Sequence, residues 1–133
     1  MSYSTDYASA ARRHLEAADG LDQTKRRDVA GYLYGIAGEC AFKQIMRESG
    51  MVPDLTEKRK ENPFFAHWPF LRTLLKDRIH GRRHGELETY ASDDRLFANW
   101  TTDMRYSPGR DVKPEDVDLW REQARTLVNR IGI

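Results

Sequence analysis

Residues 28–46 read DVAGYLYGIAGECAFKQIM, the longest stretch of the chain that would be apolar almost all the way round a helix. Val29, Leu33, Ile36 and Cys40 recur at spacings of three and four, the period of one helix face. Further apolar residues widen this stripe well beyond an ordinary amphipathic face: Tyr32, Ala37, Ala41, Phe42, Ile45 and Met46. A helix of this kind is buried among several neighbours. We therefore expect it at the centre of the fold.

Three glycines interrupt this helix, and each weakens a helix by about 1 kcal/mol relative to alanine. Gly31 and Gly35 are one turn apart, so we expect the backbone of another helix to approach on that side. Glu39 and Lys43 are four residues apart and are predicted to form a salt bridge on the edge of the apolar helix. We interpret Glu39 as one partner of this salt bridge rather than as a catalytic carboxylate.

The composition indicates one domain, residues 1–133, of a hydrophilic helical protein. Charged residues make up 32 % of the chain and hydrophobic ones 39 %, which is too apolar for a disordered protein. The net charge of +1 creates no overall attraction to nucleic acid, so any such attraction must come from local patches. The single cysteine, Cys40, excludes an internal disulfide. Without a leader-like start or an apolar run of roughly 20 residues, we expect a cytoplasmic protein that is not in a membrane.

The other segments with helical periodicity lie on both sides of the central one. Asp19-Gly20 is predicted to end the first helix, and a polar loop at 51–63 follows the central helix. Ser92 is a possible cap at which the fourth helix divides. The chain shows no convincing β-alternation, so the predicted fold is an all-α, up-and-down helical bundle of about five helices. Besides the central one, the helices are expected at residues 7–18, 69–79, 86–100 and 113–131.

Three stretches resemble the HEPN family, the helical domains named for higher eukaryotes and prokaryotes nucleotide-binding. They are AARRHLEAA at 10–18, AGYLYGIAGECAFK at 30–43 and WTTDMRYS at 100–107. The resemblance implies an up-and-down bundle that forms a homodimer. It also implies a setting in toxin–antitoxin or defence systems, where the partner is a nucleotidyltransferase or an antitoxin-like protein.

Catalytic members of that family are metal-independent ribonucleases with an Arg-x(4–6)-His motif paired across the dimer. Here Arg78 and His84 have five residues between them, so the resemblance implies these two as the catalytic pair. Six positions along a regular helix rotate a side chain by about 240°. The two side chains would therefore converge only if the segment bends at Gly81.

The segment 72–84 is also the most cationic stretch, with Asp77 as its one acid. Arginine holds phosphate in a bidentate fork, and histidine titrates near neutral pH, so these residue types suit RNA. Catalysis, RNA binding and a merely solvated basic loop remain open for it. Our prediction is a non-catalytic or weakly RNA-binding dimeric module, and the alternative is a metal-independent endoribonuclease. The predicted nucleic-acid-binding residues are Arg72, Lys76, Arg78, His80, Arg82, Arg83 and His84.

Other kinds of site find less support in the sequence. His80 and His84 have the spacing of two zinc ligands on a helix, but no third ligand is near them, so we expect no metal and no cofactor. Arg105 is expected to dock the segment around 100–109 onto the bundle, bonding either carbonyl groups or the Glu39 carboxylate. Four aromatic residues are predicted to belong to the core rather than to a base-stacking surface: Phe64, Phe65, Trp68 and Trp100.

Overall fold

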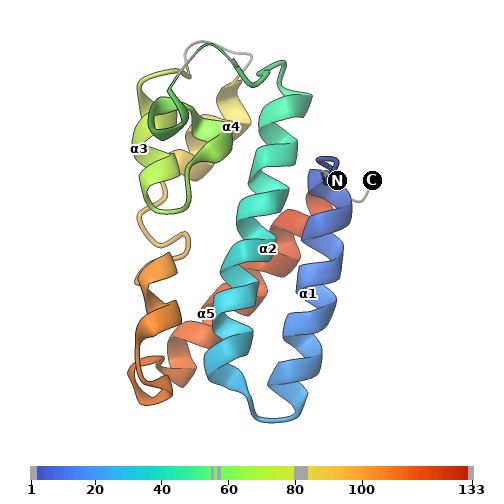
Figure 1. Cartoon of the computed structure of the whole chain (residues 1–133), viewed down its shortest axis with the longest axis vertical. Helices are drawn as coiled ribbons and strands as arrows, with labels where there is room; N and C mark the ends of the chain where they lie inside the picture. Colours follow the sequence, from blue (N-terminus) through green and yellow to red (C-terminus); the bar gives the residue numbers. More distant parts are fainter. Residues whose placement is uncertain (1–2, 55, 57, 80–83, 132–133) are drawn as a thin grey trace.

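The computed structural model describes residues 3–54, 56, 58–79 and 84–131, and these contain helices and no strand. The prediction of an all-α helical bundle is confirmed. In Figure 1, α1 and α2 run side by side in opposite directions and α5 crosses behind α2. The α-helices are α1 (Tyr7–Gln23), α2 (Arg27–Glu48), α3 (Phe70–Lys76), α4 (Gly85–Ala91) and α5 (Pro114–Ile131). Short 3-10 helices in the connections are η1 (Arg59–Glu61), η2 (Pro63–Phe65), η4 (Thr102–Tyr106) and η5 (Gly109–Asp111).

The first helix is longer than its sequence predicts, because α1 continues through Asp19-Gly20 to Gln23. Contacts from other helices hold the additional turn. The Tyr34 hydroxyl donates a hydrogen bond of 2.6 Å to the Asp19 carboxylate. The Asp22 carboxylate accepts hydrogen bonds from Arg27 at 2.6 Å and from Arg121 at 3.1 Å. Tertiary ion pairs thus override the local helix-stop signal of Asp19-Gly20.

The segment predicted as one helix at 86–100 is helical only as far as Ala91. Ser92 is the C-terminal cap of α4, so the predicted division is in the right place, but the second half is wrong. Phe97 and Asn99 have positive φ angles of 51° and 69°, which a helix does not accommodate. A tertiary contact fixes this turn, since the Phe97 amide donates a hydrogen bond of 2.8 Å to the Gln123 side chain on α5. Similarly, α3 ends at Lys76, earlier than the predicted boundary at residue 79.

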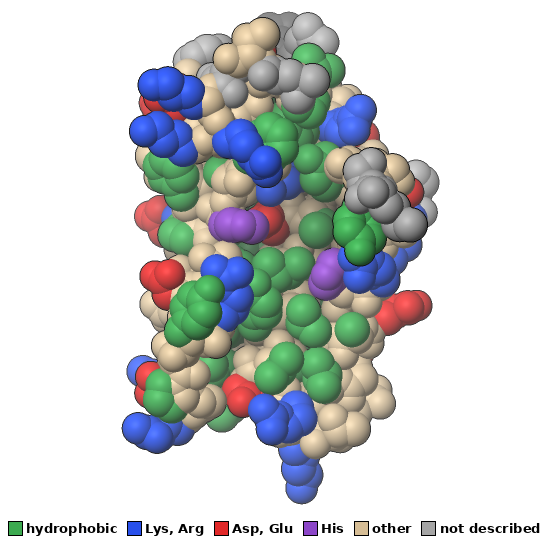
Figure 2. Space-filling model, in the orientation of Figure 1, with side chains coloured by type: hydrophobic (Ala, Val, Ile, Leu, Met, Phe, Trp, Pro, Cys, Tyr) green, Lys and Arg blue, Asp and Glu red, His purple; other side chains and the backbone are tan. Residues whose placement is uncertain are grey.

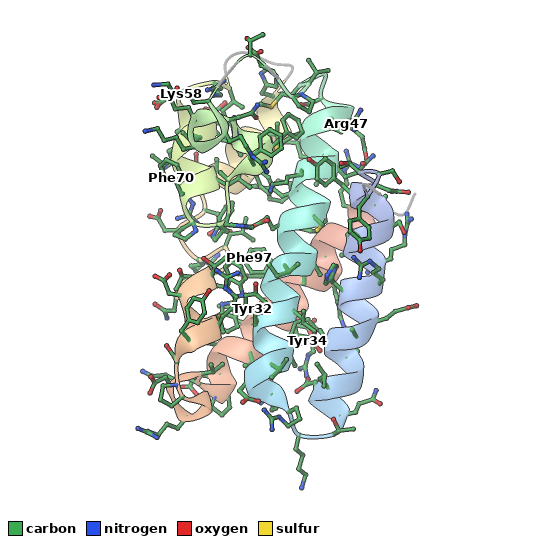
Figure 3. The ribbon with its side chains drawn as sticks, viewed as in Figure 1. Tyr32, Tyr34, Arg47, Lys58, Phe70 and Phe97 are labelled. Carbon is green, nitrogen blue, oxygen red and sulfur yellow. The ribbon has the colours of Figure 1, made fainter. Side chains whose placement is uncertain are left out.

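The glycines of α2 face aromatic side chains rather than the backbone of another helix. A Cβ atom at Gly35 would lie 2.0 Å from the Trp100 indole, and one at Gly38 would lie 2.1 Å from the Phe97 ring. At Gly31 the nearest atoms belong to Trp120 and Val117 of α5. The expected close approach is therefore present, but the expected partner is wrong. In Figure 3, Phe97 lies beside α2 on the side of the connecting segments.

The stripe that first marks α2 in the sequence is its less buried side. Val29 is 39 % exposed, and Leu33, Ile36 and Cys40 are partly buried. The side of α2 that packs against the rest of the bundle is formed by small residues together with a few large ones. This buried set is Ala30, Gly31, Tyr34, Gly35, Ala37, Gly38, Ala41, Phe42, Ile45 and Met46.

Within the described ranges, none of the helices combines the length and the apolar character that crossing a membrane requires.

Candidate nucleic-acid interface

The predicted site residues lie on α3 and on the connection from α3 to α4. Arg72 and Lys76 are on α3, Arg78 follows the helix, and His84 directly precedes α4. His80, Arg82 and Arg83 lie outside the described residues. The assignment of Arg78 and His84 as a catalytic pair stays a prediction.

Arg72 is bound within the fold by several contacts. Its guanidinium donates hydrogen bonds to the carbonyl oxygens of Asp93 at 2.8 Å and Leu96 at 3.1 Å. It also lies 4.8 Å from the centre of the Trp68 ring, and the side chain is only 18 % exposed. These contacts tie α3 to the turn that follows α4. Contact with RNA would therefore have to compete with bonds that hold the fold together.

Arg78 brings a second basic segment next to α3. Its guanidinium donates a hydrogen bond of 2.7 Å to the carbonyl of Glu61, the last residue of η1. The end of α3 therefore lies beside Lys58-Arg59-Lys60, which the sequence predicts as part of a polar loop. We call the exposed cations of the two segments the η1–α3 surface: Lys58, Arg59, Lys60, Lys76 and Arg78.

The run Lys-Arg-Lys at 58–60 indicates a basic surface, but it does not predict that η1 contacts the end of α3. Figure 2 shows several Lys and Arg side chains gathered on the upper part of this face. Figure 3 places Lys58 above Phe70 on the same side of the molecule. Glu61 and Asp77 are exposed acids within the same two segments. The net positive charge of these segments is therefore smaller than the five cations alone would give.

Two aromatic rings are exposed beside these cations. Phe70 is 51 % exposed and Phe65 is 38 % exposed, so the prediction that Phe65 belongs to the core is wrong. Phe64, Trp68 and Trp100 are buried, as predicted. The Arg59 guanidinium lies 4.5 Å from the centre of the Phe65 ring.

A groove of about 340 Å³ lies between η1, η2, the start of α3 and the start of η4, and we call it the His67 groove. Its lining includes Lys60, Phe65, His67, Phe70, Thr101 and Thr102.

Behind this groove lies the buried carboxylate of Glu39. The predicted salt bridge to Lys43 is present at 3.3 Å, but both side chains are at most 7 % exposed instead of lying on an edge. One Glu39 oxygen also accepts a hydrogen bond of 3.0 Å from the backbone amide of Trp68. His67 Nδ1 lies 3.1 Å and 3.2 Å from the two carboxylate oxygens. Glu39 thus connects α2 to the segment between η2 and α3.

The environment of Glu39 keeps it ionised. Burial by itself raises the pKa of this carboxyl group, but the His67 hydrogen bond and the Lys43 charge offset that effect. The pKa of Glu39 consequently lies below its ordinary value of 4.5. An ionised carboxylate can only accept hydrogen bonds, so His67 Nδ1 carries the proton and donates the hydrogen bond to Glu39. In the neutral imidazole, Nε2 is then the unprotonated nitrogen.

The His67 ring is anchored on one side and open on the other. Its side chain is 55 % exposed, and Nε2 forms no hydrogen bond with any part of the chain that the structure describes. An imidazole in this arrangement can accept a proton from a bound molecule or, once protonated, can contact an anion. Sequence reasoning missed His67, because it is 28 residues from Glu39 and no local spacing links them.

Among the described residues, the hydrogen bond and the ring contact of the Arg105-Tyr106 element are local and do not include Glu39. Arg105 Nε donates a hydrogen bond of 2.9 Å to the Thr102 carbonyl of the same short helix η4, and Arg105 is exposed. This bond is internal to the segment and does not dock it onto the bundle, so the predicted docking role is wrong. The guanidinium also lies over the Tyr106 ring, 5.2 Å from its centre. Among the described residues, no cluster of three or more His, Cys, Asp or Glu side chains could hold a metal ion.

Comparison of the sequence and the structure with known protein families, curated proteins and solved structures gives no match. The resemblance to the HEPN family therefore stays a prediction.

Proposed function

We propose that this protein is a HEPN-like dimeric module that binds single-stranded RNA weakly through the η1–α3 surface and the His67 groove. The observation that supports this proposal is the hydrogen bond from Arg78 to the Glu61 carbonyl, which joins two basic segments beside exposed aromatic rings. Proteins that bind single-stranded nucleic acid combine a cationic surface that contacts phosphates with aromatic side chains on which bases stack. Phe65 and Phe70 beside Lys58, Arg59 and Lys60 supply both elements.

Weak and salt-sensitive binding follows from the charge of the molecule. The net charge of +1 provides no long-range attraction, so affinity comes from the few cations of the η1–α3 surface. Each phosphate contact on a single strand contributes about −0.7 to the slope of log K against log salt concentration. Sequence-independent binding of this kind has dissociation constants of about 10⁻⁴ to 10⁻⁶ M at physiological salt.

Fluorescence anisotropy with a short labelled single-stranded RNA tests this proposal. The double variant Lys58→Ala/Lys60→Ala should weaken binding at least tenfold and reduce the salt slope by about 1.4, the contribution of two phosphate contacts. The matched control is Arg110→Ala/Lys113→Ala, which removes the same charge from two exposed residues near the start of α5. Equal affinities of the two double variants would contradict the placement of RNA on the η1–α3 surface.

The second part of the proposal, a homodimer, draws support from the partly buried stripe of α2. Val29, Leu33, Ile36 and Cys40 form an apolar line with helical spacing that the rest of the bundle leaves partly uncovered. Figure 2 shows hydrophobic side chains along the middle of this face. A second copy of the stripe, packed across a two-fold axis, would cover both.

Light scattering coupled to size-exclusion chromatography gives the molar mass that tests the dimer. Ile36→Glu places a charge in the stripe and should yield a monomer at concentrations where the unaltered protein is a dimer. Leu119→Glu is the control, because Leu119 is an exposed apolar residue on α5, outside the stripe. A monomeric unaltered protein would contradict this part of the proposal. The resemblance further suggests a nucleotidyltransferase or antitoxin-like protein as the partner of the dimer.

A further inference from the structure

We infer that His67, held by Glu39, is the general base of an RNA-cleaving site in the His67 groove, separate from Arg78 and His84. This inference rests on the proposed binding of RNA to the same surface. The arrangement that carries it is the pairing of a buried carboxylate with one nitrogen of an imidazole whose side chain is 55 % exposed and lines the groove.

The carboxylate fixes the imidazole in the orientation and tautomer that a base requires. Nδ1 is 3.1 Å and 3.2 Å from the two Glu39 oxygens, so it is the protonated nitrogen and the lone pair is on Nε2. General-base catalysis needs such an unprotonated nitrogen within hydrogen-bond reach of a substrate hydroxyl.

A purely structural role explains less of what is seen at His67. The buried charge of Glu39 already has a counter-ion in Lys43, 3.3 Å away, and a hydrogen bond from the Trp68 amide at 3.0 Å. The carboxylate thus has a counter-ion and a backbone donor besides the imidazole, whose hydrogen bond lowers the pKa of Glu39 further. A histidine that served only as a further buried partner would be covered, whereas the His67 side chain is 55 % exposed.

The other residues of the groove fit the needs of a ribonucleotide. Lys60 lines the groove and supplies a positive charge for a phosphate. Phe65 and Phe70 offer exposed ring surface on which a base can stack. Thr101 and Thr102 also line the groove.

The reaction that these groups support needs no metal and no second reagent. His67 Nε2 accepts the proton of a ribose 2′-hydroxyl, and the 2′-oxygen attacks the adjacent phosphorus while Lys60 stabilises the charge on the phosphate oxygens. The bond from phosphorus to the 5′-oxygen breaks, and that oxygen takes a proton from the His67 imidazolium. The products are a 2′,3′-cyclic phosphate and a 5′-hydroxyl, and the imidazole returns to its neutral state.

The tautomer can be measured without any activity. Long-range proton–nitrogen correlation spectra of the imidazole side chains should show His67 protonated on Nδ1 in the neutral form. Glu39→Gln should weaken this preference, while the spectrum of His14, whose Nδ1 lies 2.7 Å from the Ala10 carbonyl of its own helix, should not change. A neutral His67 protonated on Nε2 in the unaltered protein would overturn the inference.

Cleavage of single-stranded RNA in EDTA, followed beside the anisotropy measurement, tests the activity. His67→Ala and His67→Gln should each reduce the cleavage rate by about 10² to 10⁴-fold, the usual contribution of a general base. His14→Ala should cleave at the unaltered rate. Glu39→Gln, the positioning variant, should lower kcat with little change in KM. A 2′-deoxy residue at the cleaved position should block the reaction.

The outcomes separate this inference from the proposed function. Binding without cleavage by the unaltered protein would overturn the catalytic inference and leave the RNA-binding module standing. Cleavage that is lost in His84→Ala and kept in His67→Ala would overturn the inference in favour of the Arg78 and His84 motif. The absence of both binding and cleavage would overturn the proposed function together with the inference. Melting temperatures of the variants identify any loss that comes from unfolding.

Discussion

The indole ring of Trp100 lies directly on the backbone of Gly35, where a Cβ atom would be 2.0 Å from the indole Nε1. The same Nε1 donates hydrogen bonds of 3.2 Å to the carbonyl oxygens of Gly31 and Tyr32 on α2. The Tyr32 ring stacks on the indole with its centre 5.8 Å away, and Figure 3 shows Tyr32 on the side of α2 that faces the connecting segments. Gly35 is therefore the residue that allows the connection between α4 and α5 to dock on the central helix.

Gly35→Ala should destabilise the protein although alanine is the better helix former. Alanine gains about 1 kcal/mol of helix propensity, but its methyl group would force the buried indole to move. Overpacking a well-packed site costs about 1 to 3 kcal/mol, and here the displaced indole also loses its two hydrogen bonds. We therefore expect a net loss of about 2 kcal/mol in the free energy of unfolding, measured by urea denaturation.

Gly20→Ala is the control for that experiment. Gly20 is an exposed residue inside α1, and nothing lies within 4 Å of the position that its Cβ would occupy. The substitution should stabilise the protein by about 0.4 to 1 kcal/mol. If both variants shifted stability in the same direction, the steric explanation for Gly35 would not hold.

Arg72→Gln tests whether this arginine serves the fold or RNA. The substitution removes the charge over Trp68 and leaves the carbonyl oxygens of Asp93 and Leu96 without their donor, so we expect a loss of about 3 kcal/mol in urea denaturation. Lys76→Gln, on the exposed side of the same helix, should change stability by less than about 0.5 kcal/mol. An Arg72→Gln protein with normal stability and strongly reduced RNA affinity would show that RNA binding, not the fold, depends on this residue.

Glu39 should contribute to the acid sensitivity of the protein. Its pKa in the folded state lies below the ordinary value of 4.5, so its ionised form stabilises the fold above that pH. This contribution is lost as the pH falls through the lowered pKa. At pH 7, Glu39→Gln should destabilise the protein by about 3 kcal/mol because Lys43 loses its buried counter-ion.

Urea denaturation between pH 7 and pH 3 measures that contribution. The stability difference between Glu39→Gln and the unaltered protein should shrink as the pH decreases below 4.5. Glu16→Gln, at an exposed position on α1, is the control and should follow the unaltered protein at every pH. A Glu39→Gln difference that stayed constant with pH would argue against an ionised Glu39.

Cys40 should react slowly with thiol reagents in the folded protein. Burial raises the pKa of this thiol from 9.0 to about 11, and the thiolate is the reactive form. Two pKa units reduce the thiolate fraction at pH 8 by about 100-fold. We expect slow alkylation by iodoacetamide under native conditions and fast alkylation in denaturing urea, followed by mass spectrometry. Equal rates in both conditions would show that the thiol is accessible and ionises normally.

Helix positions were the most predictable part of the fold, because their signals are local. The period of three and four residues identified α2, and the helix predicted at 113–131 agrees with α5 at Pro114–Ile131. The errors occur where distant side chains decide. α1 passes through its predicted stop because Arg121 binds Asp22, and the segment after α4 turns where Phe97 bonds Gln123.

The candidate site was predictable only in part. The sequence identified the cations of α3 and the contact between Glu39 and Lys43, which are neighbours along one helix. It missed that Lys58-Arg59-Lys60 lies beside α3, because the hydrogen bond from Arg78 that brings this segment to α3 spans 17 residues. Phe65 was assigned to the core from its apolar character, but the short helix η2 directs Phe64 inward and leaves Phe65 exposed.

The sequence by itself determined that this protein is helical and that residues 28–46 form its central helix. Helix formation depends on propensity, caps and side chains three or four residues apart. All of these are properties of residues close together in the sequence. Only the tertiary structure decided that His67 meets Glu39 and that Trp100 meets Gly35. Those contacts depend on how the connections bring remote segments together, and the free energy that fixes them comes from burial and hydrogen bonds formed only in the complete fold.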